Sequence, residues 1–202
     1  MTSRTNFATA FSPIRQPDGI TCGPTCLVTL VQALTALSAG SEEVSPGPDT
    51  LRTEIQAIGR RMGTCFEYGT RHVEMEAGLR LFRLPVIRSI GGMGPDNDDG
   101  ECSGLVRTDA WEALEGTLLD GNAILLRTLW EGCKHWILLC GNAQSGLFLI
   151  EPAAGRKISL TDHQRLRSKI VNAWRLRGYD GFSVPLCAVP RPLSTVLAET
   201  TS

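Results

Sequence analysis

The sequence has almost no net charge and no long apolar run, and each absence excludes a class of protein. Its 20 Lys and Arg residues are balanced by 21 Asp and Glu residues, so the overall charge attracts neither nucleic acid nor an anionic membrane. No apolar stretch approaches the ~18 residues that span a bilayer. The first residues also lack the apolar segment of a cleavable signal peptide. We therefore expect a soluble protein, either cytoplasmic or secreted as an effector without a cleavable signal.

Cysteine is present in an odd number and histidine is scarce. The cysteines fit reduced thiols better than a disulfide framework, and they lie at positions 22, 26, 65, 102, 133, 140 and 187. Cysteine and histidine show no zinc-ligand spacing, since we expect His72 on an exposed helix and His163 near the start of another. Residues 96–101 resemble a calcium loop, but their glycine comes one position too early. The sequence therefore predicts no metal and no cofactor.

The chain is long enough for one domain with a substantial core, having 202 residues of which 42% are hydrophobic. Helical periodicity dominates its first half and short apolar runs dominate its second, which predicts an α+β fold. Helices are expected at 23–37, 48–61, 70–83, 109–121 and 161–169, and strands at 123–130, 136–140, 147–150, 156–160 and 182–189. The domain should span residues 1–190, with a flexible tail at 191–202. Residues 91–106 should form a long exposed loop that can serve as a lid.

Cys22 stands where a glycine-containing turn leads into the first helix. Unpaired backbone N–H groups and the helix dipole stabilise a thiolate there, which is what a sulfur nucleophile needs. Gly23 leaves space beside the sulfur, and Pro24 suits a first helical turn. Gln16, which precedes the cysteine, could donate its amide to a developing oxyanion. Taken alone, the pattern fits equally well a small buried cysteine and a surface glutamine.

His135 begins one apolar run and Glu151 ends the next, with the turn-type residues GNAQS between the runs. If Cys140 faces Gly146 across a five-residue loop, the His135 and Glu151 side chains lie directly opposite each other on one face. Glu151 could then hold the imidazole in one tautomer. A slip of one residue would place the two side chains on opposite faces. The alternative is a core histidine bonded to backbone and a surface glutamate.

Three segments, QPDGITCGPTCL, KHWILLCG and FLIEPAAG, together resemble the papain-like cysteine peptidases, in particular the bacteriocin-leader (double-glycine) peptidase branch. In that family a glutamine upstream of the catalytic cysteine shapes the oxyanion hole, and an acid followed by proline orients the histidine. The resemblance implies that Cys22 is the nucleophile, His135 the general base, Glu151 the orienting acid and Gln16 an oxyanion-hole donor. It also implies a helical N-terminal part, carrying the cysteine helix, packed on an antiparallel sheet that carries the histidine and the acid.

Two departures from the family pattern are Thr21, where an acid is usual, and Glu151, where Asp or Asn is usual. The expected reaction is hydrolysis of a peptide or isopeptide bond through a thioacyl-enzyme, with a protein or peptide as the partner. One alternative is deamidation or transamidation of a protein glutamine, as in effector enzymes. Another is a non-catalytic binding module on the same scaffold. The oligomeric state stays open.

Other reactive or charged groups have simpler explanations. Cys26 falls on the apolar side of its helix and is expected to pack in the core. Cys133 is a rival nucleophile, but a turn between strands offers no helix dipole to lower its pKa. The basic residues within 165–177 alternate with core residues and lack an aromatic stacking platform, so we expect no nucleic-acid site.

Overall fold

The computed structural model describes residues 7–40, 48–65, 67–85, 87–88, 110–130, 133–160, 170 and 181–199. The helices are α1 (Phe7–Ala10), α2 (Cys22–Ala39), α3 (Pro48–Met62), α4 (His72–Leu81), α5 (Ala110–Leu119) and α7 (Leu193–Ala198). The strands are β1 (Ile87–Arg88), β2 (Asn122–Trp130), β3 (Cys133–Asn142), β4 (Gly146–Glu151), β5 (Arg156–Ser159) and β6 (Gly181–Pro185). The predicted α+β class is confirmed.

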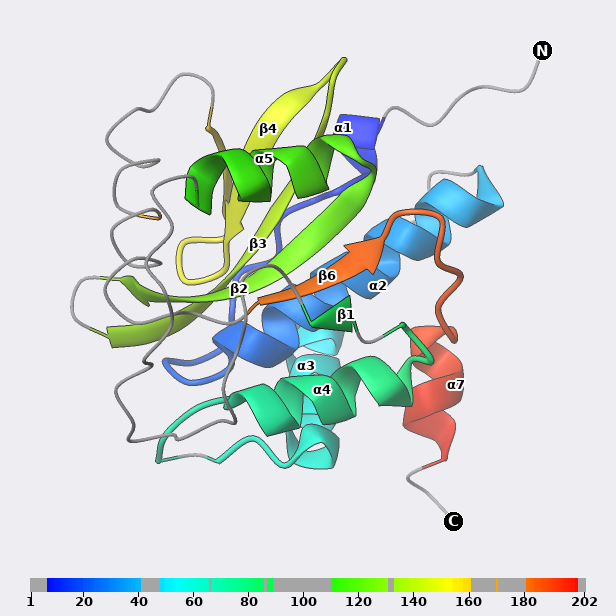
Figure 1. The fold of residues 1–202 in the computed structure, drawn as a ribbon. Helices are drawn as coiled ribbons and strands as arrows, with labels where there is room; N and C mark the ends of the chain where they lie inside the picture. Colours follow the sequence, from blue (N-terminus) through cyan, green and yellow to red (C-terminus); the bar gives the residue numbers. More distant parts are fainter. Residues whose placement is uncertain are drawn as a thin grey trace.

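The strands form one antiparallel sheet in the order β1-β6-β2-β3-β4-β5. Helix α2 packs on β2 and β3, and α1, α3 and α4 contact α2 in turn. Helix α5 packs on the same two strands but belongs to a separate hydrophobic cluster (Figure 1). The cysteine helix therefore lies on an antiparallel sheet whose strands β3 and β4 carry His135 and Glu151, the arrangement expected from the papain-like resemblance.

Both faces of the central strands are buried, which explains their nearly continuous apolar sequences. Along β3, Trp136 and Leu138 belong to the core between the sheet and α2, whereas Ile137 and Leu139 belong to the core beneath α5. This alternation is the two-residue period of a strand. Helix α2 is likewise covered on most sides. Its 18 residues have a mean hydropathy of 1.4, enough in length and composition for a membrane span, but 72% of them are buried inside the protein as in a core helix.

The predicted helices 23–37 and 48–61 match α2 and α3 within two residues. The helix expected from Thr70 begins instead at His72, and Thr70 is not its cap. The Glu74 carboxylate accepts the backbone N–H of Arg71 and thereby caps α4. The strand expected to run to residue 189 ends at Pro185. Residues 91–106 and 161–169 lie outside the described residues.

The expected flexible tail at 191–202 is wrong for its central part. Residues Leu193–Ala198 form α7, which contacts α2 and α3. Val196 is fully buried, and its carbonyl accepts a hydrogen bond from the Arg61 guanidinium. The backbone N–H of Arg191 binds the carbonyl of Phe82 at 2.9 Å. Helix α7 therefore contributes the buried Val196 to the core, and Leu193 and Leu197 pack against the same core while partly buried.

Candidate active site

The Asp18 carboxylate holds the turn that leads into Cys22. Asp18 Oδ1 accepts the backbone N–H groups of Ile20 at 3.1 Å and Thr21 at 3.0 Å, and Oδ2 accepts the Gln56 side-chain amide at 3.4 Å. Burial raises the pKa of Asp18, but these hydrogen bonds outweigh it and leave the pKa below its ordinary value. Helix α2 then begins at Cys22, so the predicted position of this residue at a helix N-terminus is confirmed.

The Cys22 thiol is buried against the backbone of β3. The residue is 6% exposed, and the backbone N–H groups of Trp136 and Gly23 lie near its sulfur. Burial raises the pKa of the Cys22 thiol above its ordinary value, although these N–H groups and the charge of Arg127 act in the opposite direction. Burial therefore acts against the thiolate that the position at a helix start was expected to stabilise. The sulfur needs a base to become a nucleophile.

His135 and Glu151 form the predicted pair. His135 Nε2 and Glu151 Oε1 are 2.9 Å apart, and the two side chains are 12% and 4% exposed. Glu151 also accepts the backbone N–H of Ala153 on Oε1 at 2.7 Å and that of Ala154 on Oε2 at 2.8 Å. Since these contacts use the carboxylate as an acceptor on both oxygens, the imidazole must be the donor at Nε2. In neutral His135 this leaves Nδ1 without a proton and able to accept one.

The pairing of β3 with β4 differs from the predicted register by two residues. Asn142 faces Gly146, and Leu138 faces Ile150, so the loop is two residues shorter than expected. A shift of two residues keeps every side chain on its face, whereas a shift of one would have reversed them. His135 and Glu151 are therefore diagonal neighbours instead of direct partners. The extra methylene of a glutamate, compared with an aspartate, helps to span this diagonal.

Gln16 is hydrogen-bonded to the turn that follows Glu151. Its backbone N–H binds the carbonyl of Pro152 at 2.8 Å, and a Cβ on Gly155 would lie 2.7 Å from Arg15 Cβ. The Gln16 side chain donates one Nε2 hydrogen to the carbonyl of Asp18 at 2.6 Å. Its Oε1 is buried with no hydrogen-bond partner among the described residues. The second Nε2 hydrogen is the one available to an oxyanion.

All four residues selected from the sequence belong to connected segments. Gln16 is bonded to the residue after Glu151, Glu151 is bonded to His135, and the strand that carries His135 packs on the helix that begins at Cys22. Among the described residues, no hydrogen bond joins Cys22 directly to His135. Catalytic hydrogen bonds are often long in a free enzyme and shorten only with substrate bound.

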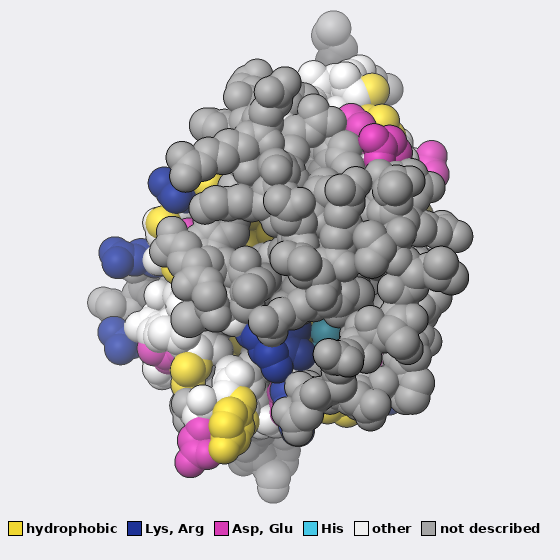
Figure 2. Space-filling model, turned by 60° about the vertical axis from the view of Figure 1, so that its left-hand side comes forward, with side chains coloured by type: hydrophobic (Ala, Val, Ile, Leu, Met, Phe, Trp, Pro, Cys, Tyr) yellow, Lys and Arg dark blue, Asp and Glu magenta, His cyan; other side chains and the backbone are white. Residues whose placement is uncertain are grey.

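Figure 2 shows a histidine side chain beside Lys and Arg side chains on one face of the molecule.

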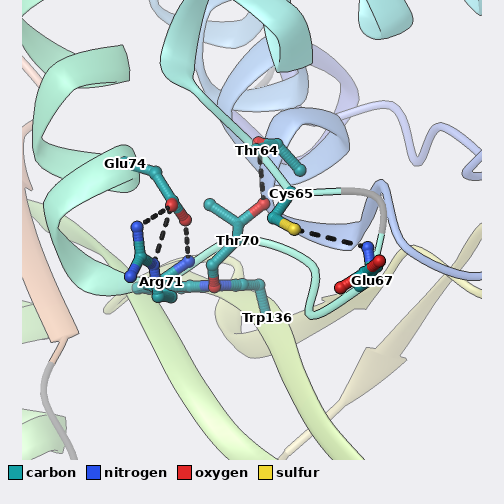
Figure 3. Close-up of polar contacts among 7 residues, drawn as sticks. All are labelled: Thr64, Cys65, Glu67, Thr70, Arg71, Glu74 and Trp136. Atoms are coloured by element: carbon teal, nitrogen blue, oxygen red, sulfur yellow. Dashed lines mark hydrogen bonds and ion pairs between the residues drawn. The ribbon is translucent and has the colours of Figure 1, made fainter. Parts of the chain in front are cut away.

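Trp136 is the site residue that sequence reasoning missed. Its carbonyl accepts a hydrogen bond from the Cys26 thiol at 3.5 Å, and its backbone N–H lies near the Cys22 sulfur and acts to lower the pKa of that thiol. Its indole donates to the carbonyl of Thr70 at 2.7 Å, in the turn between α3 and α4 (Figure 3). The contacts with both thiols use the peptide group, so no residue pattern in the sequence could signal them. The fully buried Cys26 confirms its predicted core role.

His72 was expected on an exposed helix, and this expectation is wrong. The residue is 8% exposed, and its ring packs edge-on against Trp136 with centroids 5.3 Å apart. Its Nδ1 lies 3.4 Å from Nη1 of the buried Arg127. The start of α4 is directed into the core at this point, which the mixed polarity of its sequence did not indicate.

The remaining candidates do not extend the site. Cys133 begins β3, and its side chain lies outside the described residues. His163 and residues 96–101 also lie outside them. In the parts of the chain that the structure describes, no group of three or more His, Cys, Asp and Glu side chains is placed to hold a metal ion. The described cysteines, Cys22, Cys26, Cys65, Cys140 and Cys187, are free thiols.

Comparisons with known proteins give a similarity in structure but none in sequence. No protein-family model matches the chain, and no curated protein matches its sequence. Among solved structures, the chain is similar to the peptidase domain of Streptococcus ComA, a bifunctional ABC transporter involved in a quorum-sensing pathway. The two share 15% sequence identity and a TM-score of 0.47, over 87% of this chain and 98% of that domain.

Proposed function

We propose that the protein is a papain-like cysteine hydrolase that cleaves a peptide or isopeptide bond in a protein or peptide substrate. The observation that carries this proposal is the hydrogen bond between His135 and Glu151, together with the packing of α2, which begins at Cys22, on the strand β3 that carries His135. A nucleophile, a base and an acid that orients the base are the minimum set for acyl transfer through a thioester.

The first half of the reaction follows from the protonation states. His135 Nδ1 accepts the thiol proton while the Cys22 sulfur attacks the carbonyl carbon of the scissile bond. Because burial raises the pKa of the thiol, proton transfer accompanies attack. The imidazolium then gives the proton to the departing amine, the C–N bond breaks, and the acyl group remains on the sulfur. Glu151 stabilises the imidazolium between these two steps.

The tetrahedral intermediate carries a negatively charged oxygen, which hydrogen-bond donors must stabilise. The free Nε2 hydrogen of Gln16 and the backbone N–H of Cys22 are the candidates, and each such donor is worth roughly 10² to 10³ in rate. In the second half, His135 takes a proton from water, the hydroxide attacks the thioester, and the acid product leaves as the proton returns to the sulfur.

The test is incubation of the purified protein with a cell extract, followed by mass spectrometry of the proteins in it. New termini that disappear with Cys22→Ala and His135→Ala, but persist with the control Cys187→Ala, are the expected result. Cys187 is an exposed free thiol.

Two other results would favour a different function. Conversion of glutamine to glutamate, a mass change of about one dalton, without new termini would favour a deamidase that uses the same intermediate. If the wild-type protein changes nothing beyond what Cys22→Ala changes, the protein is a binding module and the hydrolase proposal fails.

A further inference from the structure

The Asp18 side chain closes the turn that connects Gln16 to Cys22. Its Oδ1 accepts the backbone N–H groups of Ile20 at 3.1 Å and Thr21 at 3.0 Å. One oxygen therefore holds two consecutive peptide groups, and the backbone N–H of Cys22 belongs to the peptide group that follows them. The segment from Asp18 to Thr21 is thereby fixed as a single turn at the entrance to α2.

The same turn fixes the side-chain amide of Gln16. Gln16 Nε2 donates to the backbone carbonyl of Asp18 at 2.6 Å. A carbonyl can only accept, so this contact determines which end of the amide faces the turn. The backbone N–H of Gln16 binds the carbonyl of Pro152 at 2.8 Å. The main chain and the side chain of Gln16 are thus each held at one point, and a rotation of the peptide group at Asp18 would move the amide.

The second oxygen of the Asp18 carboxylate faces helix α3. Its Oδ2 accepts the side-chain amide of Gln56 at 3.4 Å, a length at which a hydrogen bond is weak. Gln56 lies on α3, and α3 packs against α2. The carboxylate therefore lies between the turn and a helix that packs on the cysteine helix, and it loses this contact if it swings away from the turn.

We propose that Asp18 is a positioning residue that sets the relative places of the two oxyanion donors, the Gln16 amide and the Cys22 backbone N–H. This inference rests on the proposed function, because an oxyanion forms only if Cys22 attacks a carbonyl. As the first residue of α2, Cys22 has a backbone N–H without an acceptor inside the helix. One donor precedes the turn and the other follows it, so the shape of the turn determines the distance between them. Donors stabilise an oxyanion best when they are in place before it forms.

The experiment compares two reactions of the Cys22 sulfur, of which only one passes through an oxyanion. With p-nitrophenyl acetate, the sulfur bonds to the carbonyl carbon, the carbonyl oxygen becomes negative, and p-nitrophenolate then leaves. With iodoacetamide, the sulfur displaces iodide directly. Both reactions consume the thiolate, so the ratio of the acylation rate to the alkylation rate reports the oxyanion donors and not the ionisation of the thiol. An acid quench and peptide mapping by mass spectrometry give both rates for Cys22 and for the exposed Cys187.

Asp18→Ala should lower the ratio at Cys22 by about tenfold, a part of the roughly 10² to 10³ in rate that one oxyanion donor contributes. Asp18→Asn keeps an oxygen that can accept both backbone N–H groups of the turn, so it should restore the wild-type ratio. Asp120→Ala removes an exposed acid and is the matched control, which should leave the ratio unchanged.

A double-variant cycle tests whether Asp18 acts through Gln16. Gln16→Ala removes one donor outright, so the turn can no longer misplace it. The loss of the ratio in the double variant, Gln16→Ala with Asp18→Ala, should therefore be smaller than the product of the two single losses. Losses that multiply in full would show that the two residues act independently and would overturn the inference.

Two further results contradict the inference, with circular dichroism reporting whether each variant is folded. One is a wild-type ratio in folded Asp18→Ala, and the other is an Asp18→Asn variant as slow to acylate as Asp18→Ala. If Asp18→Ala does not fold, Asp18→Glu decides, because it keeps the charge but adds a methylene that displaces the oxygen from the turn. A lower ratio in Asp18→Glu supports the inference, and the wild-type ratio contradicts it.

The same measurements separate this inference from the proposed function. If the ratio at Cys22 of the wild-type protein is no higher than at Cys187, no oxyanion donors serve Cys22, and the proposed function fails together with the inference. If the ratio is higher at Cys22 and Gln16→Ala lowers it but Asp18→Ala does not, the hydrolase proposal stands and only the role of Asp18 is lost.

Discussion

Thr70 packs directly on Gly23, the residue that follows the proposed nucleophile. A Cβ added to Gly23 would lie 2.5 Å from Thr70 Oγ1 and 2.6 Å from Thr70 Cβ. Thr70 is 3% exposed, and its hydroxyl contacts that of Thr64 at 3.1 Å (Figure 3). The glycine therefore lets the turn between α3 and α4 approach the start of α2. It serves packing in addition to leaving space beside the sulfur.

Gly23→Ala should destabilise the fold and displace Cys22. The β-branched Thr70 is buried and cannot rotate away, and overpacking of this kind costs about 1–3 kcal/mol. The measurement is the free energy of unfolding in urea. Gly116→Ala is the matched control, since a Cβ there meets nothing within 4 Å and alanine should stabilise α5. Equal stability of the Gly23→Ala and wild-type proteins would contradict the packing shown by the structure.

Glu151→Gln should abolish the fixed tautomer of His135. An amide has one oxygen, so it cannot accept the two backbone N–H groups of the turn and the imidazole N–H at once. We expect turnover to fall by on the order of 10²-fold if His135 acts as the base. Nitrogen NMR of the imidazole is the direct readout, because wild type should show the proton on Nε2. The same tautomer in Glu151→Gln would show that the carboxylate does not determine it.

Asp18→Ala should destabilise the protein at neutral pH by roughly 1 kcal/mol, the scale of an ordinary hydrogen bond in a folded protein. Because folding lowers the pKa of Asp18, its contribution is present above the unfolded-state value of 3.8 and is lost as the pH falls through the folded-state value. The difference in Tm between wild type and Asp18→Ala should therefore shrink in acid. Asp120→Ala, at an exposed helix end, is the control. A difference that is constant with pH would exclude a role for the charge.

Val196→Ala should cost about 1–2 kcal/mol, because it removes buried methyl groups from α7. Val189→Ala is the comparison, as Val189 is 71% exposed and should change stability by less than about 0.5 kcal/mol. Thermal unfolding of the two variants measures the difference. If they unfold alike, α7 does not contribute to the core.

In a His135→Ala background, alkylation of Cys22 should continue to accelerate above pH 9.0, the ordinary pKa of a cysteine thiol, because burial raises the pKa of this one. A raised pKa means that the thiolate forms only at higher pH. The exposed Cys187, followed in the same samples, serves as the internal reference. A Cys22 midpoint below that of Cys187 would show that the helix terminus outweighs burial.

Local patterns in the sequence were enough to predict several helices and strands. The apolar spacing after Cys22 predicted α2, because the buried apolar residues of a helix recur every three or four positions in the sequence. The runs on either side of GNAQS predicted β3 and β4 and placed His135 and Glu151 on one face. The register itself was not predictable, since two pairings that differ by two residues bury the same side chains.

The sequence by itself determined the fold class, the position of Cys22 at a helix start and the shared face of His135 and Glu151, because these follow from short-range periodicity and turn residues. Tertiary structure decided the burial of His72 and Arg127, the docking of α7, and the contact of the Trp136 backbone with Cys22. Each of these depends on segments far apart in the chain, and a backbone N–H that lies near a thiol is the same chemical group in every residue except proline. Only the packing of α2 on the sheet gives that N–H its role.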